Sequence, residues 1–225
     1  MMNDLTLLIP AKFEKESLPE VLKELSIYNC KKLIVLKKND LETIKSIKGK
    51  IDNTEILFQK GNGYGSALIE GIKHTKSKHL CIFNADGSFE ARELLKMYRL
   101  NKTTNFVFGS RYNKDSSSED DTIVTYIGNK FFSTMGQLFL NLRLNDILYT
   151  YIMGETKKFK LLKLREKDFR ICIEIPTNIK KHNFSYTLIS SHEKKRIGGE
   201  KKVNAFFDGF KILQYMLKRI FKNGK

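Results

Sequence analysis

Amide and carboxylate side chains follow directly on an apolar run near the middle of the chain. Residues 80–83 are Leu-Cys-Ile-Phe, and the next five residues include Asn84, Asp86 and Ser88. A buried strand delivers such groups to the carboxyl edge of an open α/β sheet, where ligands bind. Oxygen donors at that edge suit Mg²⁺ or Mn²⁺ carrying a nucleotide diphosphate, so we expect these three side chains to hold a divalent cation. The alternative is a strand that ends in a plain Asp-Gly turn.

Three basic side chains are candidates for binding phosphate. Arg111 follows the apolar run 106–110, and Arg196 and Lys202 lie in a basic, glycine-containing segment at 194–202. An Arg can clamp a phosphate through two parallel hydrogen bonds, and a basic loop can stabilise charge on a departing nucleotide. A lone surface Arg and a solvated charge run are the alternatives.

An acidic residue and a glycine-rich turn are further candidates. Asp146 follows a long apolar segment, where a carboxylate can act as a general base or as a cap or turn residue. Gly63 and Gly65 lie between an apolar run and a helical pattern, where glycines let backbone amides approach an anion. Ser66 stands where a dinucleotide fingerprint requires glycine, so that motif is absent, and a plain glycine turn is the alternative.

Strand and helix patterns alternate through the chain and must position these groups. The expected strands are the runs 5–9, 32–36, 56–58, 80–83, 106–110 and 186–189. The expected helices are 17–25, 41–47, 66–75, 90–99, 126–142 and 174–181, the first opened by a capping box of Ser17 and Glu20. The polar segment 114–121 is interpreted as a mobile loop, either a surface connection or a functional lid. This alternation predicts an α/β fold with a mostly parallel central sheet flanked by helices on both faces.

The C-terminal segment has a pattern of its own. Residues 1–204 are expected to form one domain, and residues 205–225 an amphipathic helix. Its Phe-rich face with Lys and Arg flanks fits either a helix lying in a membrane interface or a helix docked on the core.

Composition limits the partners and the compartment. The 225 residues include 41 Lys and Arg against 25 Asp and Glu, a formal net charge of +16, so an anionic partner is expected. The three cysteines form no Cys-x-x-Cys pair, which fits a reducing compartment. No signal peptide and no apolar run of about 20 residues is present. We therefore expect a cytoplasmic protein, peripheral at the inner face of the membrane.

Taken in order, these motifs resemble family-2 glycosyltransferases, and most of all the dolichyl- or polyprenyl-phosphate sugar transferase branch. Residues 8–18 are similar to the family's Ile-Pro-Ala-Tyr-Asn-Glu-Glu start, and residues 63–72 to its Gly-x-Gly-x-Ala-Leu-x-x-Gly-Ile helix. Residues 84–87 fall where Asp-Ala-Asp-Gly belongs, followed by Gly-Ser-Arg at 109–111. Residues 141–146 and 196–204 resemble the segment before the family's acceptor-side Asp and its Arg-x-Gly-Gly loop. The resemblance covers nearly the whole chain.

The resemblance implies a GT-A fold and an inverting hexosyltransferase. The donor would be a nucleotide-diphosphate sugar, the cofactor Mg²⁺ or Mn²⁺, and the acceptor a membrane-associated polyprenyl phosphate or growing glycan. The implied catalytic residues are Asp146, Arg111, Arg196 and Lys202. The implied nucleotide-sugar-binding residues are Pro10, Ala11, Glu14, Gly63, Gly65, Asn84, Ala85 and Asp86.

Three departures from the family pattern keep other functions open. Asn84 replaces the first acid of the motif, and Lys-Lys-Asn-Asp at 37–40 replaces Asp-Asp-Gly-Ser. Tyr-Thr-Tyr-Ile at 149–152 replaces the Ser-Gly-Phe-Arg that follows the acceptor-side Asp. One alternative is therefore a catalytically silent GT-A protein that binds a nucleotide sugar or a partner. The net charge also fits a nucleic-acid-binding module, whose affinity would fall steeply with salt. No base-stacking motif accompanies the charge, so nucleic acid is not the expected partner.

Overall fold

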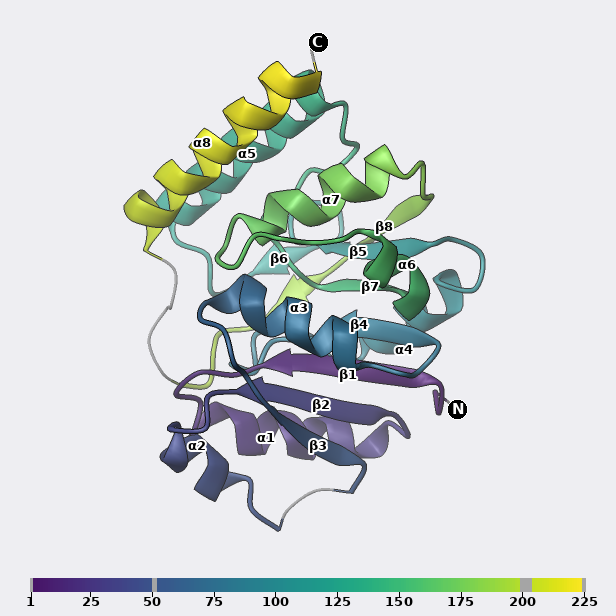
Figure 1. The fold of residues 1–225 in the computed structure, drawn as a ribbon, viewed down its shortest axis with the longest axis vertical. Helices are drawn as coiled ribbons and strands as arrows, with labels where there is room; N and C mark the ends of the chain where they lie inside the picture. Colours follow the sequence, from purple (N-terminus) through teal and green to yellow (C-terminus); the bar gives the residue numbers. More distant parts are fainter. Residues whose placement is uncertain (1, 50–51, 199–203, 224–225) are drawn as a thin grey trace.

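A seven-stranded sheet forms the centre of the protein, whose computed structural model describes residues 2–49, 52–198 and 204–223. The strand order is β3-β2-β1-β4-β7-β5-β8 (Figure 1). The strands are β1 (Leu5–Pro10), β2 (Lys31–Leu36), β3 (Thr54–Phe58), β4 (His79–Ile82), β5 (Phe106–Ser110), β7 (Ile152–Glu155) and β8 (Tyr186–Ser190). The strands expected from the apolar runs are all present within a residue or two at each end.

One strand of the sheet runs against the others. β1 to β4 pair in parallel and β5 pairs in parallel with β8, whereas β7 lies antiparallel between β4 and β5. The prediction of a mostly parallel sheet is confirmed, but it omitted β7. This four-residue strand contains Gly154, a residue that weakens a strand pattern. Gly154 is required there because a Cβ at this position would lie 2.4 Å from Cδ1 of Phe106.

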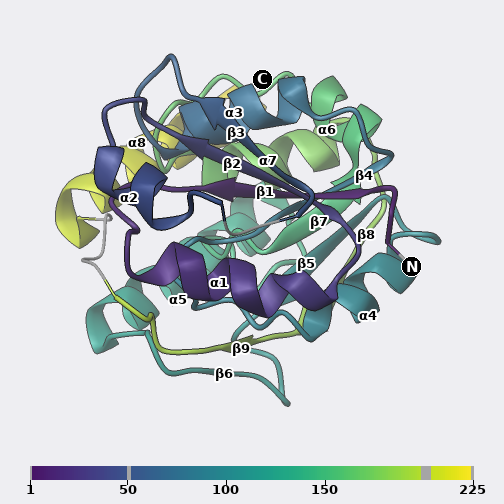
Figure 2. The ribbon, with the colours of Figure 1, turned by 90° about the horizontal axis from the view of Figure 1, so that it is seen from below.

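Helices cover both faces of the sheet over two apolar cores. The first core includes Leu7 of β1 and is covered by α1 (Ser17–Glu24), α2 (Leu41–Ser46) and α4 (Glu93–Leu100). The second includes Leu8, and its helices are α3 (Tyr64–His74), α5 (Ile123–Leu140), α6 (Thr156–Leu161), α7 (Ile171–Lys181) and α8 (Ala205–Asn223). Successive side chains of a strand point to opposite faces, which explains this division. Figure 2 shows α1 and α3 on opposite sides of β1.

Three predictions of local structure need correction. α1 has no capping box, because its N-cap is Glu16 and the Ser17 hydroxyl donates a 2.7 Å hydrogen bond to Glu14 instead. α3 begins at Tyr64, two residues before the expected start. The polar segment 114–121 is not simply a loop, because its strand β6 (Ser117–Ser118) pairs with β9 (His192–Glu193).

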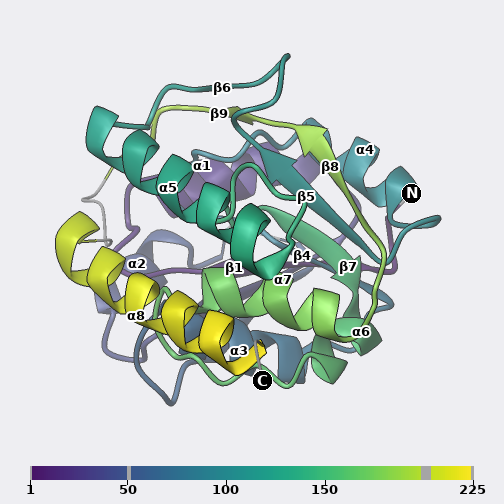
Figure 3. The ribbon, with the colours of Figure 1, turned by 90° about the horizontal axis from the view of Figure 1, so that it is seen from above.

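The C-terminal helix is present where the sequence places it. Ile212, Tyr215 and Met216 of α8 are buried in the second core, and α8 packs along α5 (Figures 1 and 3). None of the described helices is long and apolar enough to cross a bilayer.

The glycine-rich turn before α3 packs closely against a later backbone segment. Gly63 has φ +92°, a left-handed conformation that favours glycine. A Cβ on Gly65 would lie 2.2 Å from the carbonyl oxygen of Glu166, and the Ser66 amide donates to the Lys167 carbonyl at 3.0 Å. Both glycines therefore have a packing role.

Replacing Gly65 with Ala tests this packing. Because a methyl group at this position meets backbone that cannot rotate away, Gly65→Ala should lower the free energy of unfolding by about 1–3 kcal/mol. Gly128 in α5 is the matched control, since a Cβ there meets nothing within 4 Å. Gly128→Ala should instead stabilise the protein by up to about 1 kcal/mol through helix propensity. Urea unfolding of the two variants measures both effects, and equal stabilities would contradict the close approach.

Candidate active site

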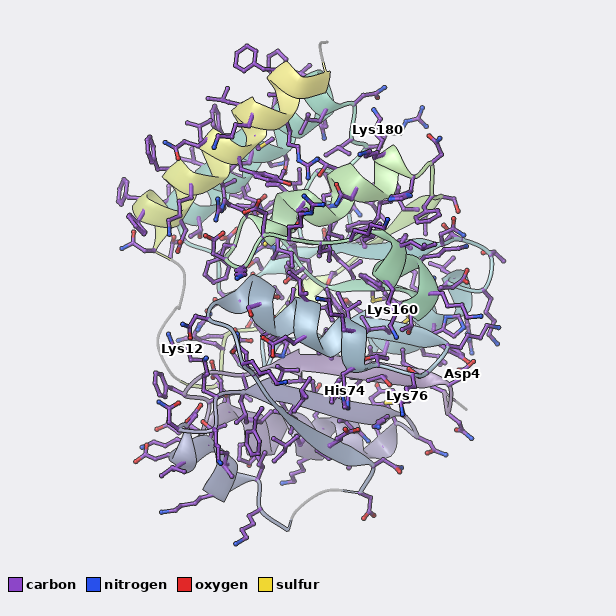
Figure 4. The ribbon with its side chains drawn as sticks, in the orientation of Figure 1. Asp4, Lys12, His74, Lys76, Lys160 and Lys180 are labelled. Carbon is purple, nitrogen blue, oxygen red and sulfur yellow. The ribbon has the colours of Figure 1, made fainter. Side chains whose placement is uncertain are left out.

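The polar groups singled out in the sequence gather where parallel strands end. β1, β4, β5 and β8 run in one direction, so the residues that follow them meet at one edge. Figure 4 shows Lys12, two residues beyond β1, at this edge, and Asp4 and Lys76 at the opposite one. Pro10, the last residue of β1, and the buried Ala11 lie at the same carboxyl edge as Lys12.

The segment after β1 is fastened to α2. The Phe13 amide donates to Asp40 at 2.7 Å, and the Glu14 amide donates to the Thr43 hydroxyl at 3.0 Å. Asp40 also caps α2 by accepting from the Thr43 amide. Glu14, expected to bind the nucleotide, is buried and accepts a hydrogen bond from Ser17. These contacts hold the first loop of the site in place.

Asp86 lies in a tight turn at the end of β4. Its Oδ1 accepts from the amide and the hydroxyl of Ser88, at 3.0 and 2.7 Å, and Gly87 has φ +82°. The basic segment lies over this turn, since the Ile197 amide donates to the Asp86 carbonyl at 2.9 Å and the Lys194 amide to Ser88 at 2.8 Å. The structure thus places the basic segment in direct contact with the Asp86 turn.

Arg196 joins two carboxylates in this structure. Its Nη2 lies 3.3 Å from Oδ2 of Asp86 and 3.3 Å from Oδ2 of Asp120. Burial lowers the pKa of Arg196, but the hydrogen bond with Asp120 and the charge of Asp86 outweigh it, so the pKa lies above its ordinary value. Asp120 was not among the candidate residues, because the polar segment 114–121 has the pattern of a surface loop.

Arg111 and Asp146 form a buried ion pair, although the sequence suggested them separately. The guanidinium donates to the two carboxylate oxygens through Nε and Nη2, both at 2.8 Å, and the Arg111 amide adds a bond of 2.9 Å. Nη1 lies 3.0 Å from Glu193, and Asn129 of α5 also donates to Asp146. Only 3% of the surface of Asp146 is exposed. Sequence reasoning missed Glu193 and Asn129, since neither stands in a recognisable motif.

The charged groups of this cluster shift one another's pKa values. Burial tends to lower the pKa of Arg111, but hydrogen bonds from Arg111 to Asp146 raise it well above its ordinary value. Burial raises the pKa of the Glu193 carboxyl, and the nearby Arg111 opposes that rise. The Arg111 guanidinium also stacks on Tyr149, with 4.6 Å from its central carbon to the ring centroid. Arg111 is therefore held in a single orientation from several sides.

The oxygen donors near Asp86 are compatible with a hard divalent cation. The described residues contain no group of three or more His, Cys, Asp or Glu side chains that could hold a metal. Mg²⁺, however, commonly binds through one or two carboxylates together with substrate phosphates and water. Asp86, with Ser88 beside it and Asn84 two residues before, fits that mode. Lys202, also expected at the site, lies outside the described residues.

A comparison with family models identifies the class of protein. The model described as Glycosyl transferase family 2 matches residues 6–162, which include β1 to β5, β7 and the Asp86 turn. The chain belongs to this family. The comparison with curated proteins found no match.

Solved structures share the fold. Mannosyl-3-phosphoglycerate synthase from Rubrobacter xylanophilus is 13% identical with a TM-score of 0.75, and the match covers 98% of this chain and 74% of that one. Glucosyl-3-phosphoglycerate synthase from Mycobacterium tuberculosis, in complex with Mn²⁺, uridine diphosphate and glucosyl-3-phosphoglycerate, is 9% identical with a TM-score of 0.73. That match covers 97% of this chain and 80% of the other. At these identities the likeness establishes the GT-A fold alone.

The Arg111–Asp146 ion pair predicts a large effect on stability. Asp146→Ala leaves a buried guanidinium without its bidentate partner, so the free energy of unfolding should fall by about 3–5 kcal/mol. Asp115→Ala is the control, because Asp115 is an exposed acid in the same half of the chain. Thermal and urea unfolding measure both variants, and an Asp146→Ala protein as stable as the control would show that the pair contributes nothing.

Proposed function

We infer that this protein transfers a sugar from a nucleotide-diphosphate donor to a phosphate-bearing acceptor at the carboxyl edge of the sheet. The observation that carries the proposal is the Asp86 turn in contact with Arg196, in a chain of the glycosyl transferase family 2. An acid for a cation and an adjacent guanidinium for phosphate are the two groups that a diphosphate leaving group needs. Inversion at the sugar and a hexose donor are part of this proposal.

Each residue of the site has a defined role in the proposal. Asp86, assisted by Asn84 and Ser88, holds Mg²⁺ or Mn²⁺, which would neutralise charge on the leaving diphosphate. Arg196 and Lys202 bind phosphate oxygens. Arg196 must then exchange its contact with Asp86 for one with the donor.

The nucleotide contacts belong to the loops around the first strands. The first strand ends with Pro10, and Ala11 and Glu14 lie in the segment after it. Ala85 lies in the Asp86 turn. Gly63 and Gly65 remain in the proposed nucleotide-sugar site through the start of α3, in addition to their packing against residues 166–168.

Asp146 and Arg111 act together in the proposal. The carboxylate already accepts hydrogen bonds from Arg111 and Asn129, so Asp146 is a positioning residue for Arg111 in this arrangement. An acceptor phosphate is ionised near neutral pH and requires little base catalysis. A sugar hydroxyl acceptor would instead require a general base, and Asp146 would then have to leave Arg111.

Two kinds of acceptor have separate support. The net charge of +16 and the amphipathic α8 favour a membrane-associated polyprenyl phosphate or growing glycan, with the enzyme peripheral at the cytoplasmic face. The two similar structures are synthases of sugar-3-phosphoglycerates, which favours a small phosphorylated acceptor. A polyprenyl phosphate and a small phosphorylated acceptor would both present phosphate to the same basic groups, whereas a glycan would present a hydroxyl.

The metal role of Asp86 is tested by an isosteric substitution. Asp86→Asn keeps an acceptor for Ser88 but removes the charge, so divalent-dependent binding of nucleotide sugars should be lost with an unchanged melting temperature. Calorimetric titration with a panel of nucleotide sugars, with Mn²⁺ or with EDTA, measures this, and Asp115→Asn is the control. Binding by the variant that ignores EDTA would rule out the metal role. Release of nucleotide diphosphate by the native protein with an acceptor distinguishes an enzyme from a silent binder.

The contact between Arg196 and Asp86 predicts competition with the metal. Removing the guanidinium frees Asp86 and Asp120 from a positive charge, so Arg196→Ala should bind Mn²⁺ more tightly in the absence of nucleotide. Loss of a partly exposed pair is worth on the order of 1 kcal/mol, roughly a fivefold decrease in Kd. Nucleotide-sugar binding should weaken in the same variant. Lys195→Ala, which changes a neighbouring cation, is the control, and unchanged Mn²⁺ affinity in Arg196→Ala would contradict the competition.

A further inference from the structure

α5 differs from an ordinary surface helix because it buries polar side chains beside Phe132 and Leu140 and exposes an apolar stripe. Its buried face carries Asn129 and Ser133, each 2% exposed and each hydrogen bonded to the segment around Asp146. Its exposed side presents large apolar side chains at the spacing of one helix stripe: Ile123, Ile127, Phe131 and Leu138. Ile123 is 80% exposed and Leu138 72%. A helix that faces only water is expected to be polar on its outer side, so this stripe indicates a partner.

α8 has a second outward apolar stripe. While Ile212 and Met216 are buried in the core, the exposed side presents Phe206, Phe210, Leu217 and Phe221. Phe206 is 83% exposed. The ring of Phe207 lies beside the stripe with the Lys211 ammonium over it, 4.2 Å from the centroid.

The two helices lie side by side at one end of the molecule. They contact each other along their lengths, and Figures 1 and 3 show that both begin on the same side. In Figure 1 that side is the left, which is also the side where β1 and β2 end. The two helices that carry the exposed stripes therefore lie next to each other, on the side of the molecule where the carboxyl edge of the sheet lies.

The charges on the two helices indicate what covers this surface. α5 contains no Asp or Glu, and α8 contains one, Asp208. Their described basic residues are Lys130, Lys211, Lys218 and Arg219. Arg219 is turned toward Glu174 and Asn178 of α7, and Lys211 lies 3.9 Å from Asp168, so the outward charge comes mainly from Lys130, Lys218 and the basic surface of the whole protein. Apolar side chains among cations match a bilayer with anionic headgroups, where each basic residue near the surface adds attraction. A second copy fits less well, because it would bring another net charge of +16 against helices with almost no acid to pair.

We propose that α5 and α8 together form a docking surface for an anionic lipid bilayer, with α5 as the helix that ties the active site to the membrane. α5 starts directly after Asp120 and Asp121, and Asp120 contacts Arg196. Its Asn129 bonds Asp146. A bilayer on the outer side of α5 thus lies across one helix from the site. The docking surface stands by itself, whereas its use to meet a lipid acceptor rests on the proposed function.

Paired substitutions in the full-length protein test the two stripes separately. The α5 variant is Phe131→Ser with Leu138→Ser, the α8 variant is Phe206→Ser with Phe210→Ser, and Ile27→Ser is the control. Ile27 is 79% exposed but lies in the 3₁₀-helix after α1, away from both stripes. Flotation with vesicles of phosphatidylglycerol and phosphatidylcholine measures binding, and the loss of binding on vesicles of phosphatidylcholine alone measures the electrostatic part.

We expect both stripes, and not the control position, to contribute to vesicle binding. Each double variant should bind anionic vesicles at least about tenfold more weakly than the native protein, because two inserted apolar side chains are lost. The Ile27→Ser protein should bind like the native one, and added salt should weaken binding in every case. Melting temperatures should not change, since the substituted side chains are exposed.

Two results would overturn the proposal, and a third would separate the docking surface from the proposed sugar transfer. If only the α8 variant loses vesicle binding, α5 is not part of the surface and the proposal is overturned. It is also overturned if the native protein ignores vesicles and light scattering shows a dimer that either variant dissociates. If both variants lose vesicle binding while no form binds a nucleotide sugar with Mn²⁺, the docking surface is supported and the proposed function fails.

Discussion

The ion pair between Arg111 and Asp146 holds together the half of the site that lies beyond the first four strands. Arg111 follows β5, Asp146 precedes β7, Glu193 belongs to β9 and Asn129 to α5, so four distant segments meet at one ion pair. Transferring two charges out of water costs several kcal/mol per ion, and only good geometry with further hydrogen bonds offsets it. The bidentate contact and the Glu193 bond meet that condition. The side of the site near α5 therefore depends on a buried ion pair, while the side near β1 and β4 is held mainly by hydrogen bonds to backbone amides and by the partly exposed contact of Arg196 with Asp86.

Much of the fold could be predicted because its strands are buried on both faces. Such strands are continuous apolar runs, and the helices between them have clear amphipathic patterns, so the patterns predicted the α/β alternation. The GT-A class was implied by the family resemblance. β7, β6 and β9 were not predicted. They have four residues or two, and short strands form only because a partner is already in place. The Ser17 capping box was wrong because a tertiary position of Glu14 offered the hydroxyl a better acceptor.

The site was predictable in residue types but not in partnerships. Asp86 and Arg196 were both selected, and the structure places them in contact. Asp120 could not be selected, because its role depends on a contact with a residue 76 positions away, and no local pattern reports that contact. Gly63 and Gly65 illustrate the opposite case. Their spacing suggested anion binding, yet the structure also gives them a packing reason, the close approach of residues 166–168. A glycine pattern alone does not distinguish the two causes.

α5 connects these observations, because one helix serves both the ion pair and the exposed surface. On its inner side Asn129 adds a further donor to Asp146, and Ser133 accepts from the Ile147 amide, which would otherwise be buried without a partner. α5 also buries Phe132 and Leu140, but most of its large apolar side chains lie on the outer side. Those outer residues can stabilise the protein only when something covers them, at about 25 cal/mol per Å² of apolar surface removed from water. Covering that side of α5 would therefore favour the helix position that keeps Asn129 on Asp146, so membrane docking and the arrangement of Arg111 would be coupled through a single rigid element.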